Sequence, residues 1–158
     1  MKIRKRYHLK KKKLKEIKKE LGEYASIIPN DATVELLETD PTPFVLVNGE
    51  PYIILINNKP YPTIKAALAN DMGGKKVVVD MGAVKFVTNG ADIMSPGIVD
   101  ADENIIPQDV VLIIEETHRK PLAIGISLIR GKEMVEKTEG KAIKTIHHIG
   151  DNIWNLEI

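Results

Sequence analysis

Residues 80–98 read DMGAVKFVTNGADIMSPGI, and this stretch decides the fold. Residues 81–89 fit a helix, because apolar side chains recur there at three- and four-residue steps. The expected apolar face is wide and consists of Ala83, Val84, Phe86 and Val87. Gly90 suits the left-handed conformation that often follows the last turn of a helix.

Three glycines, Gly82, Gly90 and Gly97, surround this helix and the turn that follows it. Glycine leaves the neighbouring backbone N–H groups uncovered, and bare donors near a helix terminus favour phosphate. The glycines would also let a sugar–phosphate backbone approach closely. The alternative is that they only satisfy unusual φ angles, and physical chemistry alone leaves both interpretations open.

Short strands with tight turns are expected on both sides of this stretch. A buried strand at residues 77–79 precedes it, and later strands are expected at residues 110–114, 122–129, 142–149 and 153–158. Few helices separate these strands, which favours a small β-barrel over a wound parallel sheet.

The first half of the chain reads as a separate small α/β unit. Residues 10–24 have a helical pattern, whose apolar stripe is formed by Leu14, Ile17, Leu21 and Tyr24. Strands are expected at residues 33–37, 44–47 and 52–56, followed by a short helix over residues 63–70. A break near residue 74 predicts two domains, residues 1–74 and residues 75–158.

Charge is distributed unevenly along the chain, although the net charge is only +1. Residues 2–19 hold eleven of the 23 basic residues and a single acid, which gives a net charge of +10. The rest of the chain holds 12 basic and 21 acidic residues, a net charge of −9. Such a split predicts a contact surface for a polyanion, with Lys12 and Lys13 as candidate contacts. A solvated basic tail that aids solubility is the alternative.

Several classes of function find no support in the sequence. The absence of Cys excludes disulfide scaffolds, Cys-bound zinc and thiol nucleophiles. The longest apolar run, residues 110–114, is far shorter than the ~20 residues of a spanning helix. No hydrophobic region follows the charged start, so we expect no signal peptide and a cytoplasmic location. Phosphate-binding loops, nucleophile elbows and His-Glu-x-x-His motifs are absent, so we expect neither catalysis nor a cofactor.

Two groups of residues carry metal-binding side chains. His147 and His148 are neighbours, and neighbours on a strand point to opposite faces, so structural or surface roles fit them better than one shared ion. Asp100, Asp102 and Glu103 offer oxygen ligands that could hold Mg²⁺, but a solvated loop is the favoured explanation of this cluster. We therefore expect no metal site.

The motif at residues 82–98 resembles the signature of the PUA domain, which is named for pseudouridine synthases and archaeosine transglycosylases. The segment IHHIGDNIW at residues 146–154 is similar to the closing strands of that domain. In the first half, VNGE at residues 47–50 and YPTI at residues 61–64 resemble the malignant T-cell amplified sequence proteins and their archaeal counterparts. This resemblance implies an α+β fold in which a small α/β pre-PUA domain precedes a PUA pseudo-β-barrel.

The same resemblance implies a non-catalytic protein that binds structured RNA, commonly tRNA or rRNA. Eukaryotic members act on the small ribosomal subunit in non-standard initiation, reinitiation and recycling, with a partner that carries an initiation-factor-like domain. Here that partner would be a separate chain. An RNA-binding accessory of a tRNA-modifying enzyme, of the transglycosylase or pseudouridine synthase type, and a protein-binding adaptor with a vestigial RNA site are the alternatives.

By position, the motif implies which residues contact the RNA backbone or a 3′ end. These are Gly82, Ala83, Lys85, Gly90 and Ala91, while Met94, Pro96 and Gly97 shape the adjoining turn. Phe86 and Trp154 could stack on bases, but the apolar spacing favours packing in the core for both.

Overall fold

The computed structural model describes residues 1–158, which form two compact units. The first unit contains residues 1–73 and 155–158, and the second contains residues 74–154. Residues 155–158 were expected in the second domain, whereas they pack with the first unit. The reason is that Leu156 is buried there, and its carbonyl oxygen accepts a hydrogen bond from Lys65 Nζ at 3.4 Å.

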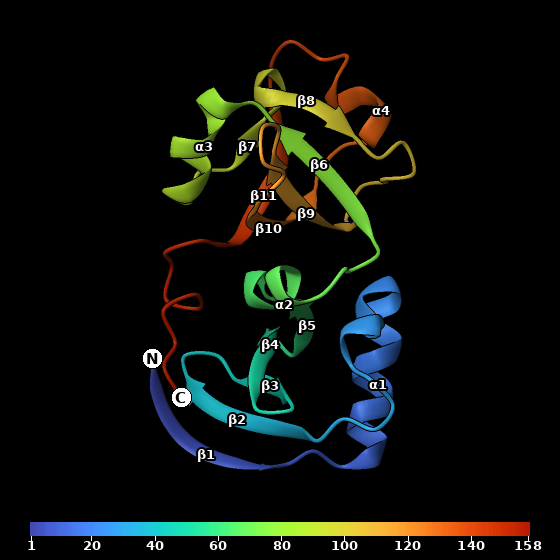
Figure 1. The fold of residues 1–158 in the computed structure, drawn as a ribbon. Coiled ribbons are helices and arrows are strands. Elements are labelled where there is room, and N and C mark those ends of the chain that lie inside the picture. Colours follow the sequence, from blue (N-terminus) through green and yellow to red (C-terminus); the bar gives the residue numbers. More distant parts are fainter. The chain divides into compact units, whose positions relative to one another are not determined.

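A five-stranded antiparallel sheet, in the order β1-β2-β3-β4-β5, forms the first unit (Figure 1). Its strands are β1 (Lys2–His8), β2 (Val34–Asp40), β3 (Phe44–Val47), β4 (Glu50–Ile56) and β5 (Lys59–Pro62). Two-residue turns at Asn48-Gly49 and Asn57-Asn58 join β3 to β4 and β4 to β5, and all four residues have positive φ. Such turns match the twist of the flanking strands, which explains why consecutive strands are neighbours.

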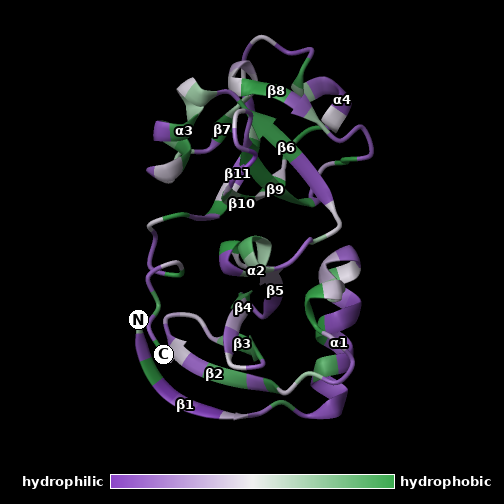
Figure 2. Cartoon of the chain, viewed as in Figure 1, coloured by the Kyte–Doolittle hydropathy of each residue, from purple (hydrophilic) through white to green (hydrophobic).

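Three helices accompany this sheet, namely α1 (Lys11–Leu21), the 3₁₀-helix η1 (Gly22–Ile27) and α2 (Ile64–Ala69). α1 packs against β5 and η1 through a stripe that includes the buried Ile17 and Leu21, and its other faces are polar (Figure 2). The helix predicted to reach residue 24 ends earlier, because Gly22 has a φ of 56° and the chain tightens into η1.

β1 is the main element that the sequence pattern did not predict. All seven of its residues are exposed, so no alternation of apolar and polar side chains marks it as a strand. Ion pairs from Arg4 to Asp40 and from Arg6 to Glu35 join it to β2. Part of the basic start is therefore an ion-paired strand and not an uncompensated tail or helix.

In the second unit a six-stranded sheet has the order β7-β11-β10-β9-β6-β8. Its strands are β6 (Lys75–Val79), β7 (Ile93–Met94), β8 (Ile98–Ala101), β9 (Val110–Glu115), β10 (Pro121–Ser127) and β11 (Lys141–His148). β6 runs parallel to β9, and every other pair is antiparallel. The α+β class predicted from the sequence is confirmed.

Three short helices connect these strands, namely α3 (Met81–Thr88), the 3₁₀-helix η2 (Ser95–Gly97) and α4 (Gly131–Met134). The core between the sheet and these helices includes Val77, Val79, Val87, Ile93, Ile113, Ala123, Met134 and Ile143. The strand predicted over residues 153–158 is absent, because Asp151 Oδ1 accepts the Trp154 N–H at 2.8 Å and closes a turn there. None of the helices combines the length and the apolar character that crossing a membrane requires.

Candidate nucleic-acid interface

A groove of about 470 Å³ lies beside α3 in the second unit. It is bounded by one side of α3 and by the segment that runs through β7 and η2. Its lining residues are Asp80, Gly82, Ala83, Phe86, Val87, Ala91, Asp92, Ile93, Met94, Pro96 and Gly97. Six of the residues singled out in the sequence motif therefore meet in one groove: Gly82, Ala83, Ala91, Met94, Pro96 and Gly97.

Small residues bring the two walls of this groove together. A Cβ atom on Gly97 would lie 3.2 Å from the Ala83 side chain, which is tighter than ordinary packing. The Gly97 carbonyl accepts the N–H of Asp80 at 2.9 Å, so η2 is hydrogen-bonded to the residue that begins α3. Larger side chains at these positions would push η2 away from the helix.

The first turn of α3 is already capped by two carboxylates. Asp80 Oδ1 accepts the Ala83 N–H at 2.8 Å, and Glu116 Oε1 accepts the Met81 N–H at 3.3 Å. A phosphate arriving at this helix end would meet negative charge and only part of the usual set of free donors. The N–H groups of Met81 and Ala83 are therefore not the bare donors expected near the helix terminus.

The open side of the groove is apolar and includes an exposed aromatic ring. Phe86 is 63% exposed, and Met94 on the opposite wall is 47% exposed. The prediction that Phe86 packs in the core is wrong, because Val87 takes the inward position and the adjacent residue lies about 100° round the helix. Gly82, one turn earlier, puts no side chain over the ring. No local signal in the sequence separates Phe86 from Val87, because both are apolar neighbours on the same helix.

Lys85 and Gly90 do not line the groove. Lys85 is exposed on α3 next to Phe86, and it forms no ion pair in the structure. Gly90 has a φ of 88°, and a Cβ atom there would lie only 2.9 Å from His148 Nε2. The positive φ therefore favours glycine at this position, and any side chain there would also displace the ring of His148.

The turn that carries Ala91 is held to β11 by Asp92. Asp92 Oδ1 accepts the Thr145 N–H at 2.9 Å, Oδ2 lies 2.9 Å from Lys141 Nζ, and Thr145 Oγ1 donates to the Ala91 carbonyl. The hydrogen bond from Lys141 lowers the pKa of Asp92, with the Thr145 N–H acting in the same direction and burial opposing both. The carboxylate thus fixes one wall of the groove.

The two neighbouring histidines have separate partners. His147 is fully buried and its Nδ1 lies 2.8 Å from Asp151 Oδ2, whereas His148 Nδ1 lies 2.9 Å from the Ile149 carbonyl oxygen. No group of three or more His, Asp or Glu side chains is arranged to hold a metal ion. Trp154 is half-buried at the end of the unit, so it belongs neither to the core nor to the groove.

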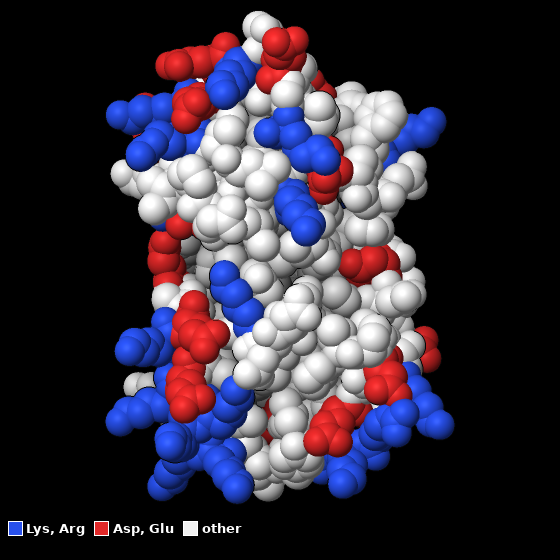
Figure 3. Space-filling model, turned by 180° about the vertical axis from the view of Figure 1, so that it is seen from behind, with Lys and Arg blue, Asp and Glu red and all other residues white.

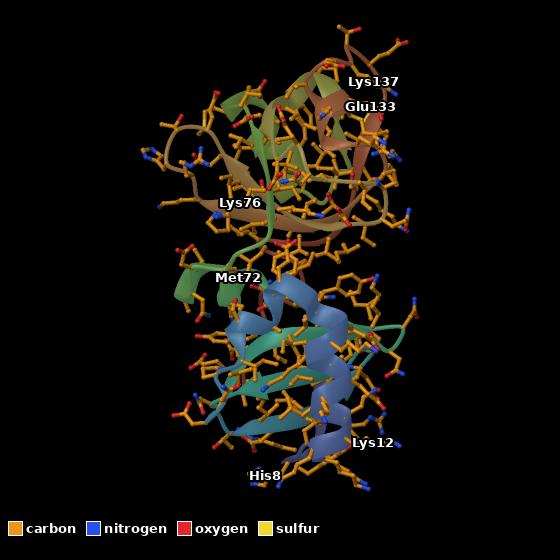
Figure 4. All side chains as sticks on the ribbon, turned by 90° about the vertical axis from the view of Figure 1, so that its right-hand side faces the viewer. His8, Lys12, Met72, Lys76, Glu133 and Lys137 are labelled. Carbon is orange, nitrogen blue, oxygen red and sulfur yellow. The ribbon has the colours of Figure 1, made fainter.

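A second, basic groove of about 500 Å³ runs along α1 in the first unit. Its lining residues are Lys11, Lys12, Leu14, Lys15 and Lys18. Figure 4 shows Lys12 in the first turn of α1, close to His8 at the end of β1. Lys13 does not line this groove, because its Nζ lies 3.4 Å from Asn58 Oδ1. Acidic side chains are interspersed with the basic ones on the face of this unit seen in the lower half of Figure 3.

Both halves of the chain match known protein families. Residues 75–149 match the PUA domain, and residues 5–70 match a domain of unknown function, DUF1947. An uncharacterised protein of Methanocaldococcus jannaschii is 50% identical over 99% of each chain. Translation machinery-associated protein 20 of Saccharomyces cerevisiae is 31% identical over 95% of this chain and 87% of its own length.

Two further relatives extend this similarity. Malignant T-cell-amplified sequence 1 of Rattus norvegicus is 29% identical over 70% of this chain and 63% of its own length. The crystal structure of a hypothetical protein from Pyrococcus horikoshii superimposes with a TM-score of 0.86 at 41% identity, over 95% of this chain and 98% of that one. The resemblance inferred from the sequence motifs is thereby confirmed, and so is the predicted succession of a pre-PUA region and a PUA fold.

Proposed function

Because this chain belongs to the family of PUA-domain proteins that includes translation machinery-associated protein 20, we propose that it is a non-catalytic RNA-binding protein that acts on tRNA or the small ribosomal subunit in translation initiation or recycling. A separate chain with an initiation-factor-like domain would be its partner.

The observation that carries this proposal is the α3 groove with its exposed aromatic ring. A ring that is 63% exposed beside an apolar groove provides a stacking surface for an unpaired base. Single-stranded ends and loops are where RNA displays such bases, because bases in a helix are already stacked. The groove therefore suits an unpaired RNA end better than a duplex.

The basic residues of the two units support a division of roles in the proposed complex. Lys85 stands next to Phe86 on α3 and would meet a phosphate of the nucleotide whose base lies on the ring. The lysines along the basic groove of α1 would add attraction to phosphate that does not depend on sequence. The Phe86 ring would select an unpaired base, whereas the lysines would raise the affinity for any RNA.

A charge reversal tests the groove. We expect Lys85→Glu to weaken the binding of a tRNA by about tenfold, which corresponds to about 1.4 kcal/mol. Lys132→Glu is the matched control, because it makes the same charge change at an exposed position on α4 of the same unit. Equal losses in both variants would show that only net charge matters and would remove Lys85 from the site.

Sedimentation of cell extract tests the cellular role. We expect the protein to co-migrate with small ribosomal subunits, and we expect the purified protein to show no turnover of nucleotides or RNA. Co-migration with free tRNA and a transglycosylase would contradict the translation role and favour a tRNA-modifying complex. RNA cleavage that follows the protein's own peak through purification would contradict the non-catalytic assignment.

A further inference from the structure

The two edges of the sheet in the first unit differ in their capacity to accept another strand. β5 forms one edge and contains Pro60 and Pro62, which have no N–H group and so interrupt any ladder on that side. β1 forms the other edge, contains no proline, and has seven exposed residues (Figure 1). Only the β1 edge offers backbone N–H groups uninterrupted by proline, and its register is regular from Lys5 to His8, after an irregularity between Ile3 and Lys5.

The register between β1 and β2 shows which backbone groups face outward. The Leu9 N–H donates to the Val34 carbonyl at 3.0 Å, next to the pair His8–Glu35. Hydrogen-bonded pairs alternate in an antiparallel ladder, so Tyr7 and Lys5 also direct their backbone groups toward β2. The N–H and C=O groups of Arg6 and His8 therefore point away from β2, on the open side.

The side chains of β1 show what kind of strand it accepts. Its present neighbour β2 is acidic: Asp40 and Glu35 pair with Arg4 and Arg6, and Glu38 accepts the Tyr7 hydroxyl at 2.9 Å. β1 itself carries no acid, and its remaining cations, Lys2 and Lys5, form no ion pair in the structure.

We propose that the open edge of β1 binds an extended acidic segment of a partner protein as an additional strand. Backbone hydrogen bonds would supply affinity, and the exposed cations would select an acidic sequence. A second copy of the same edge is disfavoured, because like charges on opposing strands repel, and this is how basic edge strands avoid self-association. RNA fits this edge less well, because phosphate oxygens accept hydrogen bonds but cannot donate to the outward carbonyls.

Three synthetic peptides, titrated against the full chain by fluorescence anisotropy, test the proposal. The first alternates Glu with Val, the second has the same sequence with N-methyl groups on the residues facing β1, and the third has Lys in place of Glu. We expect the first to bind, the second to bind at least about tenfold more weakly, and the third not to bind. Equal binding of the first two would overturn the proposal, because charge alone would then explain the affinity.

A matched pair of variants tests the same edge from the protein side. His8→Pro removes an outward N–H, whereas His8→Ala keeps it, and both lose the imidazole. We expect only His8→Pro to lower the affinity for the acidic peptide, by about tenfold. The thermal unfolding temperature should be unchanged, because proline is tolerated on edge strands. Amide hydrogen exchange adds a direct measurement: the peptide should slow exchange at Arg6 and His8. Protection of these amides by an RNA oligonucleotide and not by the peptide would overturn the proposal.

Discussion

The groove along α3 and the groove along α1 are of similar size, but the charged side chains that line them are of opposite sign. The α3 groove is lined mainly by apolar and small residues, and two carboxylates cap the helix beside it. The α1 groove has four lysines around Leu14. The first can discriminate among ligands by shape and stacking, whereas the second offers mainly attraction between charges. A basic surface alone would therefore not have led to the proposed stacking site.

The interactions that stabilise the two units differ as well. In the second unit, the half-buried carboxylates of Asp92 and Asp151 accept several hydrogen bonds each. In the first unit, β1 is joined to β2 by ion pairs such as Arg6–Glu35 that lie at the surface. Surface ion pairs contribute little to stability, whereas a buried acceptor is costly to remove. We therefore expect the scaffold of the α3 groove to be the more sensitive to mutation.

The largest effect is expected from truncating Asp151. Asp151→Ala would remove the hydrogen bonds that this carboxylate accepts from the N–H groups of His148 and Trp154 and its contact with the ring of His147, at a cost of about 2–4 kcal/mol in the free energy of unfolding. Glu35→Ala, which removes a surface ion pair, should cost about 1 kcal/mol or less. Urea denaturation measures both. If both variants lose the same free energy of unfolding, the second unit is not more sensitive to mutation than the β1–β2 region.

Acid should reduce the difference in the free energy of unfolding between the wild type and Asp151→Ala. Burial by itself raises the pKa of Asp151, but the hydrogen bonds from His147, Trp154 and His148 outweigh it and hold the pKa below its ordinary value. The stabilisation is therefore complete above the ordinary carboxyl pKa of about 3.9 and is lost as the pH falls through the lower value of the folded protein. The free energies of unfolding of the wild type and Asp151→Ala, measured by urea denaturation, should therefore approach each other as the pH falls. If their difference stays constant until the protein unfolds in acid, the Asp151 carboxylate does not stabilise the fold in this way.

The next effect concerns the stacking surface. Phe86→Ala should weaken the binding of a single-stranded RNA by about tenfold or more, because stacking on an aromatic ring contributes about 1–3 kcal/mol per base. Val99→Ala on β8 is the control, since Val99 is also apolar and exposed but does not line the groove. Filter binding with a single strand and with the matching duplex measures the difference. If both RNAs lose affinity equally, the ring does not read unpaired bases.

A smaller effect, visible mainly in its salt dependence, is expected from α1. The triple change Lys12→Gln, Lys15→Gln and Lys18→Gln should reduce the slope of log affinity against log salt by about 0.7 for each phosphate that the variant no longer neutralises, for any single-stranded RNA. Lys13→Gln is the internal control, because Lys13 contacts Asn58 and does not line the groove. An unchanged slope in the triple variant would show that these lysines are solvated and do not bind RNA phosphates.

The smallest effect tests whether the carboxylates shield α3. Glu116→Gln keeps an oxygen that can accept the Met81 N–H but removes one negative charge. RNA affinity should rise by about twofold at low salt and return to the wild-type value as salt is added. Glu103→Gln, at an exposed loop position, serves as the control. A decrease in affinity would mean that Glu116 contributes to the site and does not shield it.

Local sequence patterns determined most of the elements of this protein. Asn48-Gly49 identified a hairpin, because those residues adopt positive φ easily, and residues 81–89 identified α3 through their periodicity and the Gly90 that follows. The motif around α3 also identified six residues that meet in the groove. These features depend on neighbours in the chain, so they can be read without knowing the fold.

Tertiary structure alone decided the features that depend on distant partners. Glu116 caps α3 from a position 35 residues away, and the exposed strand β1 is placed by its antiparallel pairing with β2, a strand 26 or more residues away in the chain. Phe86 is exposed because Val87 takes the inward position on α3, although both look equally apolar in the sequence. Hydropathy indicates which side chains can be buried, but only the packing of the whole chain determines which of two apolar neighbours is buried.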